Sequence, residues 1–517
     1  MKRTLTFNVI FLCLLLFVAK TIGAVFRLPL TWIIGAEGIG IYQLVFPVYV
    51  LFLTLTSSFV PQAISKLVSS FVAQQDFKSA KKCAFIGGLV VVIGSLFGAF
   101  ILAVCAPHIS ALQGNASIVK CYYMIAPAVV FVGCMSVIKG YFQGLEIVIY
   151  TGVTNLIEQI IKVVFGLLLA SKWVQYGVIF GVMGALLGVT ISEFVSLIYL
   201  IIISLIKRKK HSVKTNTKAN IKSSECLKLF LKICFPVAIC GLIMPMVQFI
   251  DSSLIINLLP DGIDLSNKSA VFGLSGGVVG SLINLPVVFS LAVATVALPK
   301  ISGLCERKNM KEIKNVCTKA LTIVLLLTIP CMVGMMILSP NIIDFLYAGS
   351  IESDYLLIAT RLLCIGSVSI VLLALSQVTS SILQGMGKFY LPLVSLLIGG
   401  ALKIISNIIL IPKVGIMGDQ LANIVCYFAI FVINFALLAK NINNIFYFNL
   451  IKIVLASGIM CVIAFVFIGN TAISGTWLLI SAIILSVIIY FVSVGVLFIE
   501  NIIAYKKRKN KNIMQKY

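Results

Sequence analysis

One side of an otherwise apolar stretch carries four polar residues: Asn155, Glu158, Gln159 and Lys162. They stand at i, i+3, i+4 and i+7, the spacing that places side chains on a single face of an α-helix. Glu158 precedes Lys162 by four residues, which is the favourable order for an ion pair along a helix. A charge at the centre of a membrane helix costs about 2.5 to 3.5 kcal/mol on insertion scales, so it needs a partner or a water-filled cavity.

Other apolar stretches also contain charged residues. Lys20, Gly23 and Arg27 are spaced at i, i+3 and i+7, which gives the first stretch a cationic face. Further candidates of the same kind are Glu193, Gln248, Asp251, Arg361, Lys403 and Asn407.

Two interpretations of these charges stay open. In the functional one, Lys20, Arg27, Lys162 and Lys403 line a cavity that attracts a phosphate or diphosphate, and Glu158 tunes its charge. In the structural one, Glu158 and Lys162 neutralise each other at a helix contact, while Arg27, Arg361 and Lys403 extend to the membrane surface. The residues predicted to line such a cavity are Lys20, Arg27, Asn155, Glu158, Gln159, Lys162, Asp251, Arg361 and Lys403.

The composition shows which elements hold these side chains. The 517 residues are 61% hydrophobic and 11% charged, with a mean hydropathy of +1.14. So little polar surface cannot cover a water-soluble globule, and a bilayer core of about 30 Å needs about 20 apolar residues per helix. We therefore predict an all-α polytopic membrane protein of about fourteen helices, over residues 6–27, 39–60, 83–106, 118–138, 153–171, 177–206, 230–257, 271–298, 319–338, 355–383, 390–411, 414–439, 448–469 and 475–499.

The net charge of +24 does not indicate a nucleic-acid partner, because most of the 40 Lys and Arg lie in loops on one side of this topology. The opposite loops carry acids instead, among them Asp261, Asp264 and Asp344. This asymmetry predicts a cytoplasmic-membrane protein with both termini in the cytoplasm. Lys2 and Arg3 precede an apolar run without a clear cleavage site, which predicts an uncleaved first helix.

An internal repeat predicts the domain organisation. Lys162 follows Gln143-Gly144, and Lys403 follows Gln384-Gly385, with the same sequence separation in both cases. This match places the fourth span on the tenth and predicts two pseudo-symmetric six-helix lobes with a site at their interface. The predicted domains are a first lobe at 1–206, a basic linker at 207–232, a second lobe at 233–440, and two extra helices with a basic tail at 441–517.

Several signatures of catalysis and cofactor binding are missing from the sequence. It contains no G-x-x-x-x-G-K-[ST], G-x-S-x-G or H-E-x-x-H motif, so we expect no nucleotide use, no enzymatic activity and no cofactor. The fourteen cysteines form no C-x-x-C pair, and His108 and His211 are far apart. We therefore expect no metal site and no disulfide framework, with the cysteines packing as small apolar residues.

Longer motifs connect the chain to a known family. They are Lys20-Thr-Ile-Gly23 with Arg27, Gly38-Ile-Gly40-Ile-Tyr42-Gln43, Val60-Pro61-Gln62-Ala63-Ile64-Ser65-Lys66, Gly140-Tyr141-Phe142-Gln143-Gly144 with Glu158-Gln159, and Leu285-Pro286 with Ala297-Leu298-Pro299-Lys300-Ile301-Ser302. Over nearly its whole length the chain resembles the stage V sporulation protein B and polysaccharide-flippase branch of the multidrug/oligosaccharidyl-lipid/polysaccharide exporter superfamily. The resemblance implies two six-helix lobes, a C-terminal helix pair and a cavity that opens alternately to each side.

The resemblance also implies a function. The related lipid II flippases have several arginines in their cavity. Lys20 matches one of these arginines and keeps its positive charge, and Arg27 lies close to the position of another. At the position of a further arginine this chain has Ser281. The leading prediction is a flippase of lipid-linked oligosaccharide or peptidoglycan precursor for wall, spore-cortex or polysaccharide synthesis. Its expected partners are that substrate, membrane lipids, H⁺ or Na⁺ as a coupling ion, and cell-wall synthesis proteins. The alternative is a cation-coupled multidrug exporter in which Glu158 or Asp251 binds the ion. Two further hypotheses are a membrane polymerase or ligase and a non-transporting scaffold.

Overall fold

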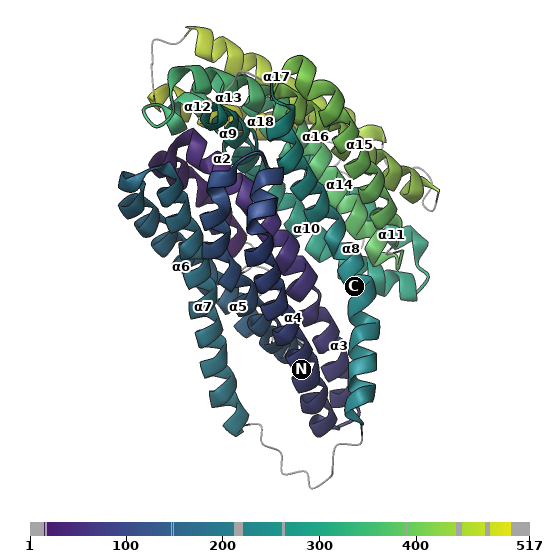
Figure 1. Ribbon diagram of the computed structural model, residues 1–517. Helices are drawn as coiled ribbons and strands as arrows, with labels where there is room; N and C mark the ends of the chain where they lie inside the picture. The colour runs from purple at the N-terminus through teal and green to yellow at the C-terminus, as the bar shows by residue number, and fades with distance from the viewer. Residues whose placement is uncertain are drawn as a thin grey trace, which may run out of the picture. The chain divides into compact units, whose positions relative to one another are not determined.

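The computed structural model describes residues 15, 18–145, 147, 149–210, 221–260, 264–388, 390–440, 447–470 and 476–497. Regular structure in these ranges is helical, apart from one isolated bridge between Ala348 and Ile351 (Figure 1). Thirteen described segments are long and apolar enough to cross a membrane. One of them, Val18–Ala73, has 56 residues and extends over about 84 Å, enough for two crossings of a core roughly 30 Å thick. The prediction of an all-α polytopic membrane protein is confirmed.

The chain divides into two compact units. Unit 1 comprises Met1–Ser281 and Gly400–Ala422, and unit 2 comprises Leu282–Gly399 and Asn423–Tyr517. The predicted division into lobes at 1–206 and 233–440 stays a prediction.

The elements wholly inside unit 1 are α2 (Arg27–Leu53), η1 (Thr54–Ser58), α3 (Val60–Ala73), α4 (Phe77–Leu112), η2 (Ala116–Ile118), α5 (Val119–Gly144), α6 (Ile149–Trp173), η3 (Val174–Tyr176), α7 (Val178–Lys210), α8 (Ser223–Leu258), α9 (Leu265–Gly273) and η4 (Leu274–Val279). Those wholly inside unit 2 are α11 (Met310–Ile337), α12 (Ser339–Tyr347), α13 (Ser353–Gly366), α14 (Val368–Gly385), α17 (Tyr447–Asn470) and α18 (Thr476–Leu497). The unit boundary crosses α10 (Gly280–Glu306), α15 (Tyr390–Val414) and α16 (Met417–Ala439).

Local sequence signals explain several helix boundaries. Gly35, at φ 69° and ψ −173°, interrupts the helix labelled α2, so the gap expected between the first two spans shrinks to one non-helical residue. The carboxylate of Asp76 accepts a hydrogen bond from the Ser79 amide at 3.0 Å and caps the N-terminus of α4. Asn309 caps α11 in the same way, accepting from the amide of Glu312 at 3.2 Å.

Glycines allow helices of unit 1 to approach closely. A Cβ added at Gly188 of α7 would lie 2.4 Å from both the Cα and the amide nitrogen of Gly166 on α6. A Cβ at Gly40 of α2 would lie 1.8 Å from the carbonyl oxygen of Ser269 on α9. Small residues at such crossings are the usual means by which membrane helices pack without a hydrophobic driving force.

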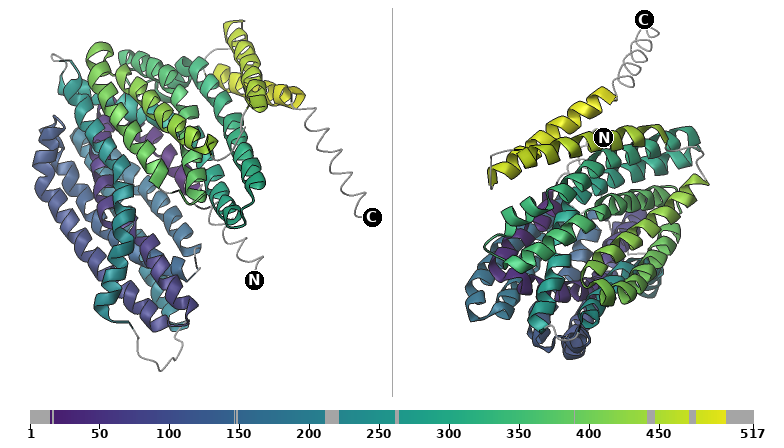
Figure 2. Two further views of the ribbon diagram at one scale, coloured as in Figure 1. Left: turned by 90° about the vertical axis from the view of Figure 1, so that its right-hand side faces the viewer. Right: turned by 90° about the horizontal axis from the view of Figure 1, so that it is seen from above.

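Unit 2 has its own apolar core. Side chains of α10, α11 and α14 interlock there, with Ile301, Leu321 and Ile382 fully buried. The two last helices, α17 and α18, pack side by side (Figure 2), and the hydroxyl of Tyr490 on α18 donates to the carbonyl of Leu326 on α11 at 2.7 Å.

One expectation about the cysteines is wrong. Cys83 on α4 and Cys226 on α8 form a disulfide, with their Cα atoms 5.2 Å apart. The two residues are 143 positions apart in the sequence, and no spacing rule could show that α4 and α8 meet there. The remaining cysteines of the described ranges whose side chains are placed carry free thiols.

We predict that Gly188→Ala destabilises the α6–α7 contact, because its new methyl group meets backbone atoms that cannot rotate away. The expected cost is about 1 to 3 kcal/mol, visible as a lower thermal unfolding temperature of the purified protein in detergent. Gly94→Ala on α4 is the matched control, since a Cβ there meets no atom within 4 Å. Equal unfolding temperatures for the two variants would contradict close packing at Gly188.

Candidate functional site

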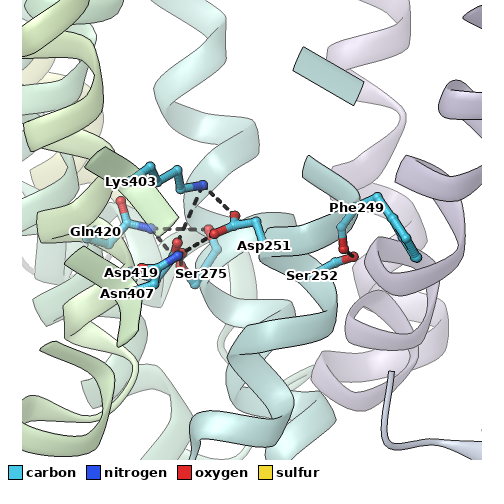
Figure 3. Close-up of polar contacts among 8 residues, drawn as sticks. All are labelled: Phe249, Asp251, Ser252, Ser275, Lys403, Asn407, Asp419 and Gln420. Atoms are coloured by element: carbon cyan, nitrogen blue, oxygen red, sulfur yellow. Dashed lines mark hydrogen bonds and ion pairs between the residues drawn. The ribbon is translucent and has the colours of Figure 1, made fainter. Parts of the chain in front are cut away.

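A buried polar network lies among α8, α15, α16 and η4 of unit 1 (Figure 3). The ammonium of Lys403 donates to a carboxylate oxygen of Asp251 and lies 3.8 Å from the carboxylate of Asp419. Asn407, one turn after Lys403, donates to the other oxygen of Asp251. We call Asp251, Ser275, Lys403, Asn407, Asp419 and Gln420 the Lys403 network.

Each element contributes to this network for a local reason. Asp419 stands in the first turn of α16, where the positive end of the helix dipole favours a carboxylate. Ser275 belongs to the π-helical turn η4 and donates to Asp419, while the amide of Gln420 donates to the Ser275 hydroxyl at 2.7 Å. π-helical turns are frequent at functional sites because they shift the register of the side chains.

α8 is held on a second face as well. Ser252, which follows Asp251, points away from Lys403 in Figure 3 and accepts a hydrogen bond from the amide of Gln113 at 3.4 Å. Gln113 ends α4, and its amide also donates to the carbonyl of Leu44 on α2 at 2.9 Å. The segment around Asp251 is therefore fixed from both sides.

The charges of the Lys403 network do not cancel. Two carboxylates face one ammonium, which leaves one negative charge when all three groups are ionised. The carbonyl oxygen of Asn407 is buried and accepts no hydrogen bond. In the described part of the chain no set of three or more His, Cys, Asp and Glu side chains is placed to hold a metal ion. What the network offers is an acceptor-rich position for one small cation or one proton.

A second cluster lies around the predicted polar face of α6. Lys139 on α5 donates to Asn155 at 2.8 Å and lies 3.8 Å from the carboxylate of Glu158. Gln159 donates to the same carboxylate at 2.9 Å, and its own carbonyl oxygen is buried without a hydrogen-bond partner. Glu158 is therefore paired across helices with Lys139, and no contact within 4.0 Å joins it to Lys162, the partner that the sequence indicated.

Lys162 lies near an aromatic ring, two acids and a second cation. Its ammonium lies 5.6 Å from the ring centre of Phe26, a cation–π distance, and it interacts electrostatically with Arg27, Glu158 and Glu193. Gly23 lies directly against this face, since a Cβ there would be 2.6 Å from the carbonyl oxygen of Gln159. The first span and the polar face of α6 thus meet at Gly23.

The remaining acid of this region is Glu193 on α7. It is buried, and one of its carboxylate oxygens has no hydrogen-bond partner, although the buried Tyr49 lies beside it. We call the residues Arg27, Lys139, Asn155, Glu158, Gln159, Lys162 and Glu193 the α6 cluster. With three cations and two acids, this cluster carries one positive charge when all five groups are ionised.

The structure places two of the predicted residues at exposed positions. Lys20 has an exposed side chain, and Arg361 is exposed on α13 in unit 2. Four contributors were not predicted as site residues: Lys139, Ser275, Asp419 and Gln420. Lys139 was assigned to a loop because the fourth span was expected to end at 138, whereas α5 continues to Gly144. In the sequence, Asp419 and Ser275 are only polar residues near the start of apolar spans, which is weak evidence for a site.

The fold and these clusters define a class. The chain is a multi-pass membrane protein with charged groups buried among its helices, and its relatives place it among membrane transporters of the flippase type. It belongs to the polysaccharide biosynthesis protein family, whose model matches residues 5–305. A second model, MatE, matches residues 236–409.

Individual relatives agree with this assignment. The chain is 25% identical over 442 residues to the lipid II flippase MurJ of Bacillus subtilis, covering 82% of this chain and 80% of that protein. It is 23% identical over 414 residues to stage V sporulation protein B of the same organism, covering 78% of each. A solved structure of the lipid II flippase MurJ in an inward closed conformation aligns with a TM-score of 0.70 at 20% identity, over 96% of this chain and 99% of that one. An inward-facing multidrug transporter of the MATE family aligns with a TM-score of 0.64 at 16% identity, over 82% and 95%.

We predict that Lys403→Met lowers stability by about 3 to 5 kcal/mol, because it leaves Asp251 and Asp419 buried without their cation. Combining it with Asp251→Leu should recover part of the loss, since one unpaired carboxylate is then removed. Lys413→Met, which changes an exposed lysine of the same helix, is the control. Unfolding temperatures in detergent measure all three. A Lys403→Met variant as stable as the control would show that the ion pair does not hold α8 to α15.

Proposed function

We propose that this protein is a flippase of a lipid-linked oligosaccharide or peptidoglycan precursor, used in wall, spore-cortex or polysaccharide synthesis and working by alternating access. The observation that carries the proposal is the surplus positive charge of the α6 cluster. A buried cation without a resident counter-ion is costly in a membrane protein, and a transported phosphate or diphosphate supplies the missing charge. The name of one relative, a lipid II flippase, supports the same substrate class, and the name of another, a sporulation protein, supports a role in sporulation.

The α6 cluster suits transient binding. Arg27 and Lys162 offer charge-assisted hydrogen bonds to phosphate oxygens, which are stronger than neutral ones. Glu158 and Glu193 compete with the anion for Lys162 and so weaken its binding. A transport site requires this balance, because an anion held too tightly is never released.

The lipid part of the substrate also has a matching feature. A pocket of about 300 Å³ in unit 2 is lined almost wholly by apolar side chains of α11, α12, α17 and α18, including Leu326, Pro330, Met460 and Phe491. Such a pocket accepts a polyprenyl chain, whose burial contributes roughly 0.8 kcal/mol per methylene. We propose that this pocket of unit 2 binds an apolar lipid chain.

The orientation follows from the charged loops. We propose that both termini face the cytoplasm, as the excess of lysine and arginine on one side indicates. The chain then takes its substrate from the cytoplasmic leaflet and delivers it to synthesis enzymes on the other side. It performs no covalent chemistry itself.

We predict that Lys162→Gln and Arg27→Gln each slow transport of a fluorescent undecaprenyl diphosphate sugar, assayed with purified protein in liposomes. Loss of one charge-assisted hydrogen bond of about 1.5 to 3 kcal/mol corresponds to roughly 10- to 100-fold weaker binding. Lys172→Gln is the matched control, because Lys172 is an exposed cation in the last turn of the same helix. Wild-type protein that moves no such lipid, or full activity in both cluster variants, would overturn the proposal.

A second candidate function is cation-coupled export of small molecules. The observation that favours it is the surplus negative charge of the Lys403 network, together with the MATE-type fold relatives. In this reading Asp251 or Asp419 takes up H⁺ or Na⁺. The same network can equally supply the coupling step of a flippase.

We predict that Asp419→Asn removes the response of transport to an imposed H⁺ or Na⁺ gradient, because Lys403 then balances Asp251 and no charge is left to attract a cation. The flux in liposomes should become independent of the gradient while transport driven by substrate concentration persists. Asp344→Asn, at an acid of α12 in unit 2, serves as control. If both wild type and the variant export fluorescent drugs and neither moves a lipid-linked sugar, the result favours the exporter over the flippase.

A further inference from the structure

A second pocket in unit 1 belongs to neither cluster. It has a volume of about 380 Å³, within the usual range for small-molecule sites, and lies between α4, α5 and α7. α5 packs against both α4 and α7 (Figure 1). The lining is Lys81, Ala84 and Phe85 of α4, Val137, Ile138, Tyr141 and Phe142 of α5, Leu145 and Ile147 after it, and Ser204 of α7.

The position of this pocket relative to the bilayer follows from the sequences of the helices that line it. On α4, Lys78, Lys81 and Lys82 precede the apolar run that continues to the end of the helix. On α7, the apolar run ends at Ile206 and four cations follow, Lys207–Lys210. Because each helix leaves the bilayer where its apolar run meets its cations, the pocket lies at the boundary between hydrocarbon and headgroups, on the cation-rich side.

Aromatic rings mark the same level. The ring centres of Phe142 and Tyr150 are 5.3 Å apart, and those of Tyr141 and Phe142 are 6.4 Å apart. Tyrosines concentrate at membrane interfaces because one end of the ring is apolar and the other is wet. Phe85, at the mouth of the pocket, is 72% exposed, so the pocket opens sideways toward the surrounding lipid.

We propose that this pocket binds a phospholipid with an anionic headgroup. The phosphate pairs with Lys81, the one charged residue among the described lining residues, and an acyl chain lies against Phe85, Ile138 and Phe142. A lysine beside an apolar cavity at the headgroup level matches the phosphate of an anionic amphiphile. The lipid is a resident component of the membrane and is distinct from the transported molecule.

The test uses the full-length protein in detergent, titrated with phosphatidylglycerol or with phosphatidylcholine of the same chains, and counts bound lipids by native mass spectrometry. We expect wild type to bind phosphatidylglycerol more tightly than phosphatidylcholine. Lys81→Gln should weaken phosphatidylglycerol binding about tenfold and leave phosphatidylcholine unchanged, and Lys81→Arg should restore it. Lys66→Gln, at an exposed lysine of α3 outside the pocket, is the charge control.

A second variant tests the binding of the lipid's acyl chain rather than that of its phosphate. Ser204→Phe fills the pocket without removing a charge, and it should weaken binding of both lipids, whereas Ser171→Phe at an exposed serine of α6 should not. Equal binding of the two lipids by wild type, or equal effects of Lys81→Gln and Lys66→Gln, would overturn the proposal. Preference for undecaprenyl diphosphate over phosphatidylglycerol at this pocket would also overturn it, because the pocket would then be a substrate site. Liposome transport by Lys81→Gln reports separately on the flippase.

Discussion

A charge buried among membrane helices has no water to solvate it, and this constraint decides where the helices of unit 1 meet. Lys403 can remain on α15 only because α8 brings Asp251 to it and α16 brings Asp419. Lys139 on α5 depends in the same way on Asn155 and Glu158 of α6. Each buried cation therefore fixes the position of a neighbouring helix, and the apolar contacts fill the space between those fixed points.

The second determinant of packing is the close approach of backbones at glycine. α6 and α7 touch at Gly166 and Gly188, and this contact holds α6 so that its polar face is directed to α5 and to the first span. Lipid offers apolar side chains as good an environment as the protein interior does, so shape rather than hydrophobicity selects the crossing point. Gly166 lies one turn after Lys162 on the polar face of α6, so the close contact with Gly188 of α7 continues that face.

The sequence predicted the class of the fold because hydropathy and charge asymmetry report directly on the bilayer. It also predicted that Asn155, Glu158 and Gln159 share a face, since helical periodicity is local. The partner of Glu158 could not be predicted. A lysine four residues away is the only partner visible in the sequence, whereas Lys139 becomes available only when α5 continues past the expected end of its span. The Cys83–Cys226 disulfide was missed for the same reason, because it depends on a long-range contact of α4 with α8.

The two clusters carry opposite surplus charges, and this difference gives the proposed transport cycle a physical basis. An anionic headgroup at the α6 cluster cancels its extra positive charge, and a cation or proton at the Lys403 network cancels its extra negative charge. Both clusters are then neutral only when both ligands are bound, and moving a charged cluster through a low-dielectric interior costs more than moving a neutral one. Coupling between headgroup and cation needs no direct contact on this account, because each ligand removes an electrostatic cost from the same unit.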